Sequence, residues 1–421
     1  MLQLPISYVG GEAVPYIDAL FTSVSALCVT GLSTVSMDIY TNFGLGVILF
    51  LIEAGGLGIL TFVSLLLGLS SKKISLVNRK LIKDYFIDDV ESSPRRILKS
   101  IIKYTVIIQS TGAVLLMPFL YYQGEPLWAF YSFFFSISAF CNAGFSPYSN
   151  SLSNYYDNPY ILFVIMFLII FGGLGFLVMK NITQIIRKKT KHLYLHSKIV
   201  IFMTLFLIIS GAAVVFFTEY NKSLDGYSIW KKIYLSLFQS VTTRTAGFEV
   251  VPQCDFSAPV LIYDITLMFV GGSSGSIAGG IKTTTAFIAI LYVLNGNAEK
   301  HIINIGNRQI DPDLVNKAIA IISRSILFIF ISIFTLSMTE SISIASGDMK
   351  ITDIMFEVVS AFGTVGLSQG ITGILTTGGK VAVILTMFIG RTGIFAMALH
   401  LTKKNSNDFD IRLPKERILL G

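Results

Sequence analysis

The chain has 421 residues, of which 53% are hydrophobic and only 14% are charged, and its mean hydropathy is +0.70. A soluble domain of this length cannot bury so much apolar surface, so the composition excludes a soluble globular protein and predicts an integral membrane protein. The apolar segments are long and continuous, and about 20 such residues cross the hydrocarbon layer as a helix. We therefore expect an all-α membrane protein rather than a β-barrel.

The net charge of +7 is unevenly distributed along the chain. Residues 1–71 and 120–179 contain no Lys or Arg, whereas basic residues gather in 72–103 and again in 180–198. This asymmetry follows the positive-inside rule, so both basic blocks are predicted to be cytoplasmic loops, with lipid or nucleic-acid binding as the less favoured interpretation. Cys28, Cys141 and Cys254 lack zinc-ligand spacing and are interpreted as small apolar packing residues.

The predicted helices include four that are too short to span a membrane. In chain order we expect a short helix over 14–26, spans at 43–69 and 97–122, a short helix over 126–140, spans at 159–179 and 199–218, a short helix over 228–243, an interrupted return over 256–294, a cytosolic connector over 295–324, a span at 325–346, a short helix over 354–362 and a last span at 380–402. Each short helix precedes a glycine-containing loop, which indicates a re-entrant segment lining a wet cavity.

Four loop glycines share a register with the residues around them. The glycines are Gly31, Gly144, Gly247 and Gly366, and a second glycine follows them by 24, 28, 24 and 24 residues, at Gly55, Gly172, Gly271 and Gly390. Six residues before the loop glycines stand Ser25, Ser138, Val241 and Ser360, and ten before stand Phe21, Phe134, Leu237 and Phe356. This register predicts four pseudo-symmetric units, at 1–70, 71–190, 191–295 and 296–421.

The first unit contains a short helix and a following span but no opening span. The chain would therefore cross the membrane seven times, with its N-terminus outside and its C-terminal tail in the cytoplasm. We expect the missing helix to lie upstream of Met1, with residues 1–6 as its last turn. A natural seven-span protein is the alternative.

Four re-entrant loops around one axis would surround a narrow hole with backbone carbonyls. Such oxygens can replace the water shell of a monovalent cation, and glycine permits the torsions that aim them. The short helices would point their partially negative C-terminal ends at the same hole. The expected filter residues are Val29, Thr30, Gly31, Asn142, Ala143, Gly144, Thr245, Ala246, Gly247, Thr364, Val365 and Gly366, with potassium bound there; for any one glycine alone, an ordinary turn is the competing interpretation.

These loops, together with the strings VTTRTAGF at 241–248 and GGIKTTT at 279–285, resemble the Trk/Ktr/HKT superfamily of potassium transporters, and most of all the bacterial Ktr membrane subunit. The resemblance covers essentially the whole chain. It implies four M1–P-loop–M2 units around one pore, a homodimer, and a cytosolic ring of nucleotide-binding, KtrA-like regulatory subunits. It also suggests that the tail at 412–421 packs at the dimer interface.

Residues 271–280 interrupt a span with five glycines and three serines. Each glycine costs a helix about 1 kcal/mol relative to alanine, so an intramembrane loop is expected, with a glycine-rich helix-packing face as the alternative. The resemblance implies that this loop is a gate beneath the filter. The expected gate residues are Gly271, Gly272, Ser273, Ser274, Gly275, Ser276, Gly279, Gly280 and Arg391.

Two arginines stand at the register of the repeated sites. Arg391 lies in mid-span, where an arginine is costly and marks a functional site by default. We expect it to face the pore below the filter, to oppose cations, and to contact the gating loop or a carboxylate such as Glu53; a purely structural buried pair is the alternative. Arg244 is expected to brace the third loop from behind.

The sequence therefore predicts potassium translocation across the bacterial plasma membrane by a multi-pass, non-enzymatic protein. Sodium as a coupling or activating ion stays open, and nucleotide would act only through a partner, because the chain has no dinucleotide fingerprint. Membrane lipids are expected partners and nucleic acid is not. The alternatives are a secondary transporter of another small solute, a sodium-coupled cation transporter with broken helices, and, third, a membrane enzyme, for which no nucleophile or metal cluster is found. Lys231 and Lys232 are interpreted as solvated.

Overall fold

A computed structural model describes residues 1–58, 94–188, 190–295, 303–305 and 308–393. Its helices are α1 (Tyr16–Cys28), α2 (Asn42–Gly56), α5 (Pro94–Tyr122), α6 (Trp128–Phe140), α7 (Pro159–Leu174), α8 (Phe176–Ile186), α9 (Leu195–Glu219), α10 (Ile229–Thr242), α11 (Ala258–Phe269), α12 (Thr283–Asn295), α13 (Pro312–Thr339), α14 (Ser341–Ser346), α15 (Ile351–Gly363) and α16 (Thr377–Thr392). A small antiparallel hairpin, β1 (Ile303–Ile305) and β2 (Arg308–Ile310), precedes α13.

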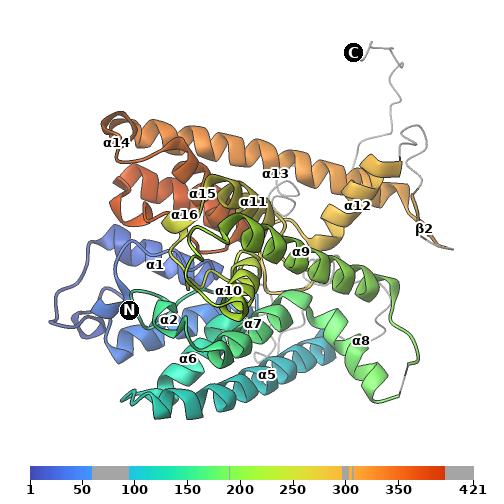
Figure 1. Cartoon of the computed structure of the whole chain (residues 1–421), viewed down its shortest axis with the longest axis horizontal. Coiled ribbons are helices and arrows are strands. Elements are labelled where there is room, and N and C mark those ends of the chain that lie inside the picture. The colour runs from blue at the N-terminus through green and yellow to red at the C-terminus, as the bar shows by residue number, and fades with distance from the viewer. Residues whose placement is uncertain (59–93, 189, 296–302, 306–307, 394–421) are drawn as a thin grey trace, which may run out of the picture.

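The long helices form the frame of the molecule. In Figure 1, α5 runs along one edge, α13 along the opposite edge and α9 between them, while the short helices α1, α6, α10 and α15 lie inside this frame. Within the described residues, α9, α13 and residues 100–122 of α5 are each long and apolar enough to span a membrane. The all-α membrane fold expected from the composition is confirmed.

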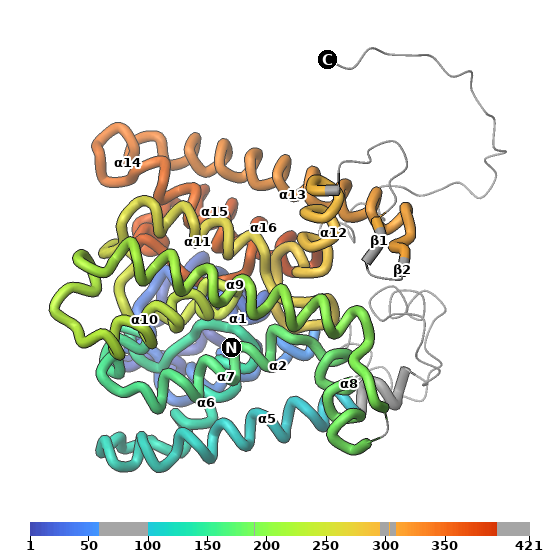
Figure 2. Tube along the Cα trace, turned by 45° about the vertical axis from the view of Figure 1, so that its right-hand side comes forward, coloured from blue at the N-terminus to red at the C-terminus, as the bar shows by residue number. Residues whose placement is uncertain are grey.

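The short helices are packed in a cyclic order. Each one packs on the helix that follows the loop of the unit before it: α6 on α2, α10 on α7, α15 on α11, and α1 on α16. The last of these contacts joins the fourth unit to the first, so the four units close into a ring. Figure 2 shows α1, α6, α10 and α15 between α5 and α13 from a second direction. This arrangement brings the C-terminal ends of the four short helices together.

Buried carboxylates join the end of α9 to the beginning of α11, and the end of α13 to the beginning of α16. Glu219 ends α9 and accepts hydrogen bonds from the backbone N–H and hydroxyl of Ser257, which precedes α11. Glu340 follows α13 and accepts from the N–H and hydroxyl of Thr376, the N-cap of α16. Both carboxylates are fully buried, and each satisfies backbone donors at the beginning of a helix, where such donors have no partner within the helix.

The first unit achieves the same result with backbone groups. The N–H of Thr41, the N-cap of α2, donates to the carbonyl of Ser7 at 2.9 Å, and its hydroxyl donates to the carbonyl of Ile6 at 2.7 Å. A short 3-10 turn over Pro5–Ser7 presents these carbonyls to α2. Residues 6 and 7 therefore occupy the place that a glutamate takes in the third and fourth units.

Several predicted spans have different limits in the structure. The span expected at 159–179 breaks at Gly175, where α8 turns by 103° from α7, because Gly175 adopts a φ of 82° that a helix does not allow. Helix α13 begins at Pro312, so part of the expected connector at 295–324 is helical. The parts of the expected spans beyond residues 58 and 393, the basic loop at 72–93 and the tail from 394 lie outside the described residues.

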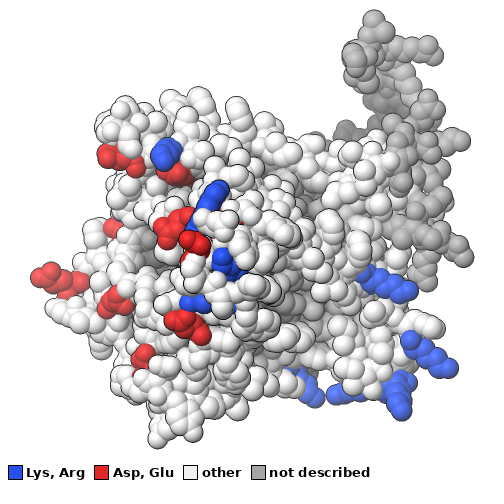
Figure 3. All heavy atoms as spheres, viewed as in Figure 1, with Lys and Arg blue, Asp and Glu red and all other residues white. Residues whose placement is uncertain are grey.

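The acidic side chains lie toward one end of the molecule. Figure 3 shows basic side chains alone at the end beside α8, whereas the other end carries acidic side chains with a few basic ones among them. We call the first the basic end, defined by the part-buried Lys180 and the exposed Arg187, Lys188, Lys191 and Lys198, and the second the acidic end, defined by the exposed Glu12, Asp157, Asp225, Asp255 and Asp348. This separation matches the charge pattern of the sequence.

Lys231 and Lys232 are not simply solvated, and that interpretation was wrong. The ammonium of Lys231 pairs with Asp157 and lies 3.8 Å from the ring centre of Tyr156. Lys232 is only 5% exposed; its ammonium donates to the carbonyl of Tyr220 and stands 3.7 Å from the centre of that ring. The aromatic residues of the neighbouring loops surround both cations and so offset their loss of water.

Candidate ion-conduction site

Each short helix ends in a loop with an unusual backbone. The residue two before each loop glycine has a positive φ, of 57° at Val29, 56° at Asn142, 69° at Thr245 and 50° at Thr364. The glycines themselves have φ values of 100°, 69°, 76° and 97° at Gly31, Gly144, Gly247 and Gly366. Three of the four non-glycine residues are β-branched, for which a positive φ is a genuine outlier, and strain of this kind gathers at functional sites. The intervening residue does not share this torsion, and such alternation turns successive carbonyls toward one side.

The four loops meet in a closed ring. Each loop glycine faces the carbonyl oxygen of the residue that precedes the next loop glycine. The pairs are Gly31 with Ala143, Gly144 with Ala246, Gly247 with Val365, and Gly366 with Thr30. A Cβ atom added at Gly31 would lie 2.5 Å from its facing oxygen, and one at Gly144 2.8 Å; the other two approaches are closer still. No side chain fits at these positions without displacing backbone, so the ring depends on glycine.

Buried hydroxyl groups hold the loops. The hydroxyl of Ser138 donates to the carbonyl of Phe145 at 2.7 Å, and that of Thr242 donates to the carbonyl of Phe248 at 2.6 Å. In the other two units the serine hydroxyl accepts instead, from Gly31 in the first unit and from Gly366 in the fourth, each at 3.1 Å; the serines are Ser25 and Ser360. Sequence reasoning did not give these residues a function, although the recurring serine six positions before the glycine was the signal.

The third unit is shifted by one residue from the expected register. Thr242 supplies its bracing hydroxyl instead of Val241, and Phe238 is buried to 1% exposure where Leu237 was expected to correspond to the other phenylalanines. The reason lies in the turn that follows α10. The N–H groups of both Ala246 and Gly247 donate to the carbonyl of Thr242, so this turn is one residue shorter than the others.

The second set of glycines marks how the third unit differs. Cβ atoms added at Gly55, Gly172 and Gly390 would collide with carbonyl oxygens at the ends of their own short helices, those of Leu27, Phe140 and Phe362. Each of these carbonyls lies four residues before a loop glycine, so the contact is equivalent in three units. In the third unit, Gly271 instead faces the carbonyl of Gly279. The folded-back segment at 271–280 therefore takes the place of a helix–helix contact.

The segment at 271–280 is not helical, as its glycine content predicts. It leaves α11 and folds back, with the N–H of Gly271 donating to the carbonyl of Ile281 at 2.9 Å. A Cβ atom at Gly279 would collide with the side chain of Thr364, and one at Gly271 would lie 3.1 Å from the side chain of Thr245. The segment thus lies directly against the third and fourth loops of the ring.

Arg391 links the folded-back segment to the first unit. Its guanidinium donates to the carbonyl of Ile277, within the segment, and to the carbonyl of Gly55 at the end of α2. Glu53 accepts a hydrogen bond of 2.8 Å from the side-chain amide of Gln109, and the thiol of Cys141 lies 3.5 Å from the same carboxylate. Of the two expected partners of Arg391, the segment is thus a hydrogen-bond partner in the structure.

Arg244 lies beside the third loop and reaches away from it. It is 7% exposed, and its guanidinium donates to the carbonyl of Gly271 at 3.3 Å and to that of Thr204 on α9 at 3.5 Å. This side chain therefore connects the loop to the beginning of the folded-back segment.

The interpretation of the cysteines as packing residues needs two corrections, because Cys141 contacts Glu53 and Cys254 is exposed.

Buried acids that the sequence argument passed over stand behind the ring. Glu357 on α15 is fully buried and accepts hydrogen bonds from the hydroxyls of Ser368 and Thr372, which follow the fourth loop. Asp264 on α11 is fully buried and accepts from the amide of Gln239 on α10 at 2.8 Å. Glu357 thereby fixes the chain that leaves the fourth loop to the short helix that enters it, and Asp264 joins α11 to α10. An acidic residue within an apolar helix was the sequence signal.

The comparisons with known proteins agree with this architecture. Residues 4–411 match the model of the TrkH family, described as cation transport proteins, so the chain belongs to that family. It is 37% identical to the potassium/sodium uptake protein NtpJ of Enterococcus hirae and 36% identical to the Ktr system potassium uptake protein B of Bacillus subtilis, covering 100% of this chain and 93% of each relative. The crystal structure of the potassium transporter TrkH from Vibrio parahaemolyticus has the same fold, with a TM-score of 0.74 at 19% identity, over 93% of this chain and 79% of that one.

Proposed function

We propose that the chain conducts potassium ions across the bacterial plasma membrane through the ring formed by its four loops. The observation that carries this proposal is the cyclic contact between each loop glycine and the carbonyl before the next one. Carbonyl oxygens held around a narrow hole can replace the water shell of a potassium ion. The names of the relatives, potassium and potassium/sodium uptake proteins, support this choice of ion.

The twelve residues expected from the sequence would coordinate the ion mainly through their backbones. Positive φ values at both ends of each three-residue stretch turn the carbonyls in one direction. The C-terminal ends of α1, α6, α10 and α15 converge on the ring, and their partial negative charge favours a cation at that point. The chain thus offers a dehydrated potassium ion both ligands and a favourable potential.

The segment at 271–280 would act as the gate beneath this filter, and Arg391 would hold it in the closed position. The guanidinium ties the segment to Gly55 and adds a positive charge near the proposed path of the ion. A permanent charge at membrane depth is costly, so its presence there marks a functional site. Opening would require the segment to leave Arg391 and the loops above it, which gives the closed state a defined set of contacts to break.

Regulation is proposed to come from outside this chain. The basic end would face the cytoplasm, in accordance with the positive-inside rule, and with it the C-terminal tail. The Ktr resemblance supports a homodimer whose inner loops carry a cytosolic ring of nucleotide-binding subunits, and this orientation would leave those loops accessible to the ring. The four units at 1–70, 71–190, 191–295 and 296–421 would supply the pore, and the partners would supply nucleotide sensing.

A sodium-coupled cation transporter is the second candidate function. One observation favours it: the relative at 37% identity is named a potassium/sodium uptake protein. In that case the same ring would bind potassium while sodium acted as the coupling or activating ion. The two functions are separated by the dependence of potassium uptake on a sodium gradient in sealed vesicles.

The substitution Gly366→Ser tests the filter. The added side chain would collide with the carbonyl of Thr30 and occupy a positive-φ position, so potassium-uptake-deficient bacteria expressing the variant should lose rescue or gain sodium uptake. Rubidium and sodium fluxes are measured for the wild type and the variant. Gly46→Ser is the matched control, because a Cβ atom there meets open space. Unchanged ion selectivity in Gly366→Ser would remove the filter proposal.

A further inference from the structure

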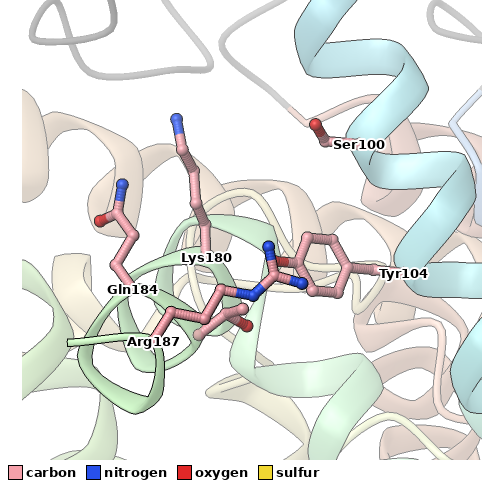
Figure 4. Close-up of a pocket in the computed structure, with 6 residues that line it drawn as sticks. Ser100, Tyr104, Lys180, Gln184 and Arg187 are labelled. Carbon is pink, nitrogen blue, oxygen red and sulfur yellow. The ribbon is translucent and has the colours of Figure 1, made fainter. Parts of the chain in front are cut away.

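A pocket of about 160 Å³ opens at the basic end, between α5 and α8. It is lined by Ser100, Tyr104, Lys180, Thr183, Gln184 and Arg187. In Figure 4, Lys180, Gln184 and Arg187 extend from α8 into the space that Ser100 and Tyr104 border from α5. Among the residues that the structure describes, the lining contains two cationic side chains, four neutral polar ones and no acidic one, so it suits an anion with several oxygen acceptors.

The direction of α8 places these groups along the membrane surface. The break at Gly175 turns α8 by 103° from α7, so α8 leaves the direction of the span. Counted from Lys180, the other lining residues of α8 follow after three, four and seven positions, at Thr183, Gln184 and Arg187. This spacing puts all four on one face of the helix. This polar face points into the pocket while Ile186 beside it is 74% exposed.

Within the described part of the chain, the two cations of the pocket have no counter-ion. Neither the ammonium of Lys180 nor the guanidinium of Arg187 has a hydrogen-bond or ion-pair partner within the residues that the structure describes. Guanidinium and ammonium groups bind phosphate oxygens through charge-assisted hydrogen bonds. The hydroxyl and amide groups around them can donate further bonds to the same group.

The surface next to the pocket is apolar rather than aqueous in character. On α5, Ile107 follows Tyr104 by three residues and Ser100 by seven, so it shares their face of the helix, and it is 50% exposed. It lies within the part of α5 that is apolar enough to span the membrane. A bound phosphate in the pocket would therefore have a hydrocarbon-facing helix surface beside it, as a phospholipid requires.

From this geometry we propose that the pocket binds the phosphate headgroup of an anionic phospholipid of the inner leaflet, with the acyl chains along the exposed face of α5. Basic pockets between helices on the cytoplasmic side are suited to such headgroups. This assigns a specific lipid to the basic block at 180–198, for which a plain solvated loop was the favoured interpretation of the sequence.

The junction between α7 and α8 connects this pocket to the segment at 271–280. The N–H of Ser273 donates to the carbonyl of Gly173 at 3.0 Å, and the N–H of Phe176 donates to the carbonyl of Gly275 at 3.2 Å. The hydroxyl of Ser273 also donates to the carbonyl of Leu174. A lipid that ties α8 to α5 would hold this junction, and with it the segment. Lipid binding stands on the pocket alone, whereas its effect on ion flux rests on the proposed gating function.

The binding experiment uses the purified full chain and native mass spectrometry with phosphatidylglycerol or phosphatidylcholine. Lys180→Gln/Arg187→Gln should weaken phosphatidylglycerol binding by about 30-fold, since each basic side chain near anionic lipid contributes about 1 kcal/mol. The control pair Lys191→Gln/Lys198→Gln removes two exposed cations of the basic end outside the pocket. Equal loss in both pairs, or no preference for phosphatidylglycerol in the wild type, would overturn the proposal.

Two further measurements keep the result interpretable. Gln184→Glu adds a negative charge with little change of shape and should also weaken phosphatidylglycerol binding if the pocket is the site; unaltered binding would contradict it. Inorganic phosphate serves as a competitor, and complete displacement of the lipid by phosphate at low concentration would show a site for a free anion instead.

Ion flux separates the site from its consequence. In phosphatidylcholine vesicles, added phosphatidylglycerol should change potassium flux through the wild type but not through Lys180→Gln/Arg187→Gln. Lipid binding without any flux response would refute the coupling and leave the site intact. No potassium flux in either kind of vesicle would refute the proposed function, and the mass-spectrometric result would still decide the lipid site.

Discussion

The hydroxyl of Thr242 is expected to hold the third loop in its conducting shape. It donates to the carbonyl of Phe248 across the loop that contains Thr245 and Gly247, over a distance of 2.6 Å, and it is fully buried. Thr242→Val removes this donor while it keeps the shape of the side chain. The change therefore tests the bond rather than the packing.

The size of the effect follows from the burial of the acceptor. Leaving a buried carbonyl without its donor costs about 1–3 kcal/mol, which corresponds to a factor of about 5 to 150 in an equilibrium constant. The loop already carries a positive φ at Thr245, so the lost bond had been holding a strained conformation. We expect the ratio of potassium to sodium permeability to fall by about fivefold or more.

The assay measures rubidium and sodium uptake into proteoliposomes, together with the melting temperature of the purified protein. Thr266→Val is the matched control, because the hydroxyl of Thr266 donates to a carbonyl within its own helix at 3.2 Å and the residue is exposed. Wild-type selectivity in Thr242→Val, combined with a melting temperature that falls no further than in the control, would refute the assignment of this hydroxyl as a brace of the filter.

Three other changes probe the frame of the ring. The ammonium of Lys380 lies 2.5 Å from the carboxylate of Asp18, 362 residues away in sequence, and Asp18→Asn removes this counter-ion. The change should lower the free energy of unfolding by about 3–5 kcal/mol. Thermal melting should show that Asp18→Asn/Lys380→Gln recovers part of the loss. Gly175→Ala should cost about 1–3 kcal/mol, because its φ of 82° and ψ of 154° suit only glycine, and a melting temperature equal to the wild type's would contradict the sharp break seen there. The hydrogen bond from Lys231 holds the pKa of Asp157 below its usual range, so its contribution is present above the unfolded pKa of about 3.9 and is lost as the pH falls through the lower folded value; melting curves at acid pH should be less pH-sensitive in Asp157→Asn.

The spacing of the glycines was enough to predict the ring, because backbone geometry that only glycine tolerates leaves a mark at fixed positions. Gly31 and Gly366 are examples. Each is separated in sequence from its second glycine, Gly55 or Gly390, by the same 24 residues, and both pairs occupy equivalent places in the structure. The class of membrane protein likewise followed from apolar length and charge pattern. Both signals are local, and a single sequence displays them directly.

The features that the sequence did not predict depend on the direction of the chain or on distant partners. Apolar residues continue through Gly175 without interruption, so hydropathy could not separate α7 from α8. The turn after α10 is one residue shorter than the other three, which shifts Val241 and Leu237 out of register without changing the spacing of the glycines. The aromatic surroundings of Lys232 come from a loop whose approach no local pattern records.

The contact of α16 with α1 has a consequence for how the protein is made. Three of the four joints in the ring lie between units that follow one another along the chain, whereas this one has no peptide to join it. It is held only by non-covalent contacts, which include the Asp18–Lys380 ion pair and the packing of Gly366 against the carbonyl of Thr30. During synthesis α1 is made long before α16, so Asp18 gains its partner Lys380 only after the last described helix has been made. The ring therefore cannot close before that contact forms.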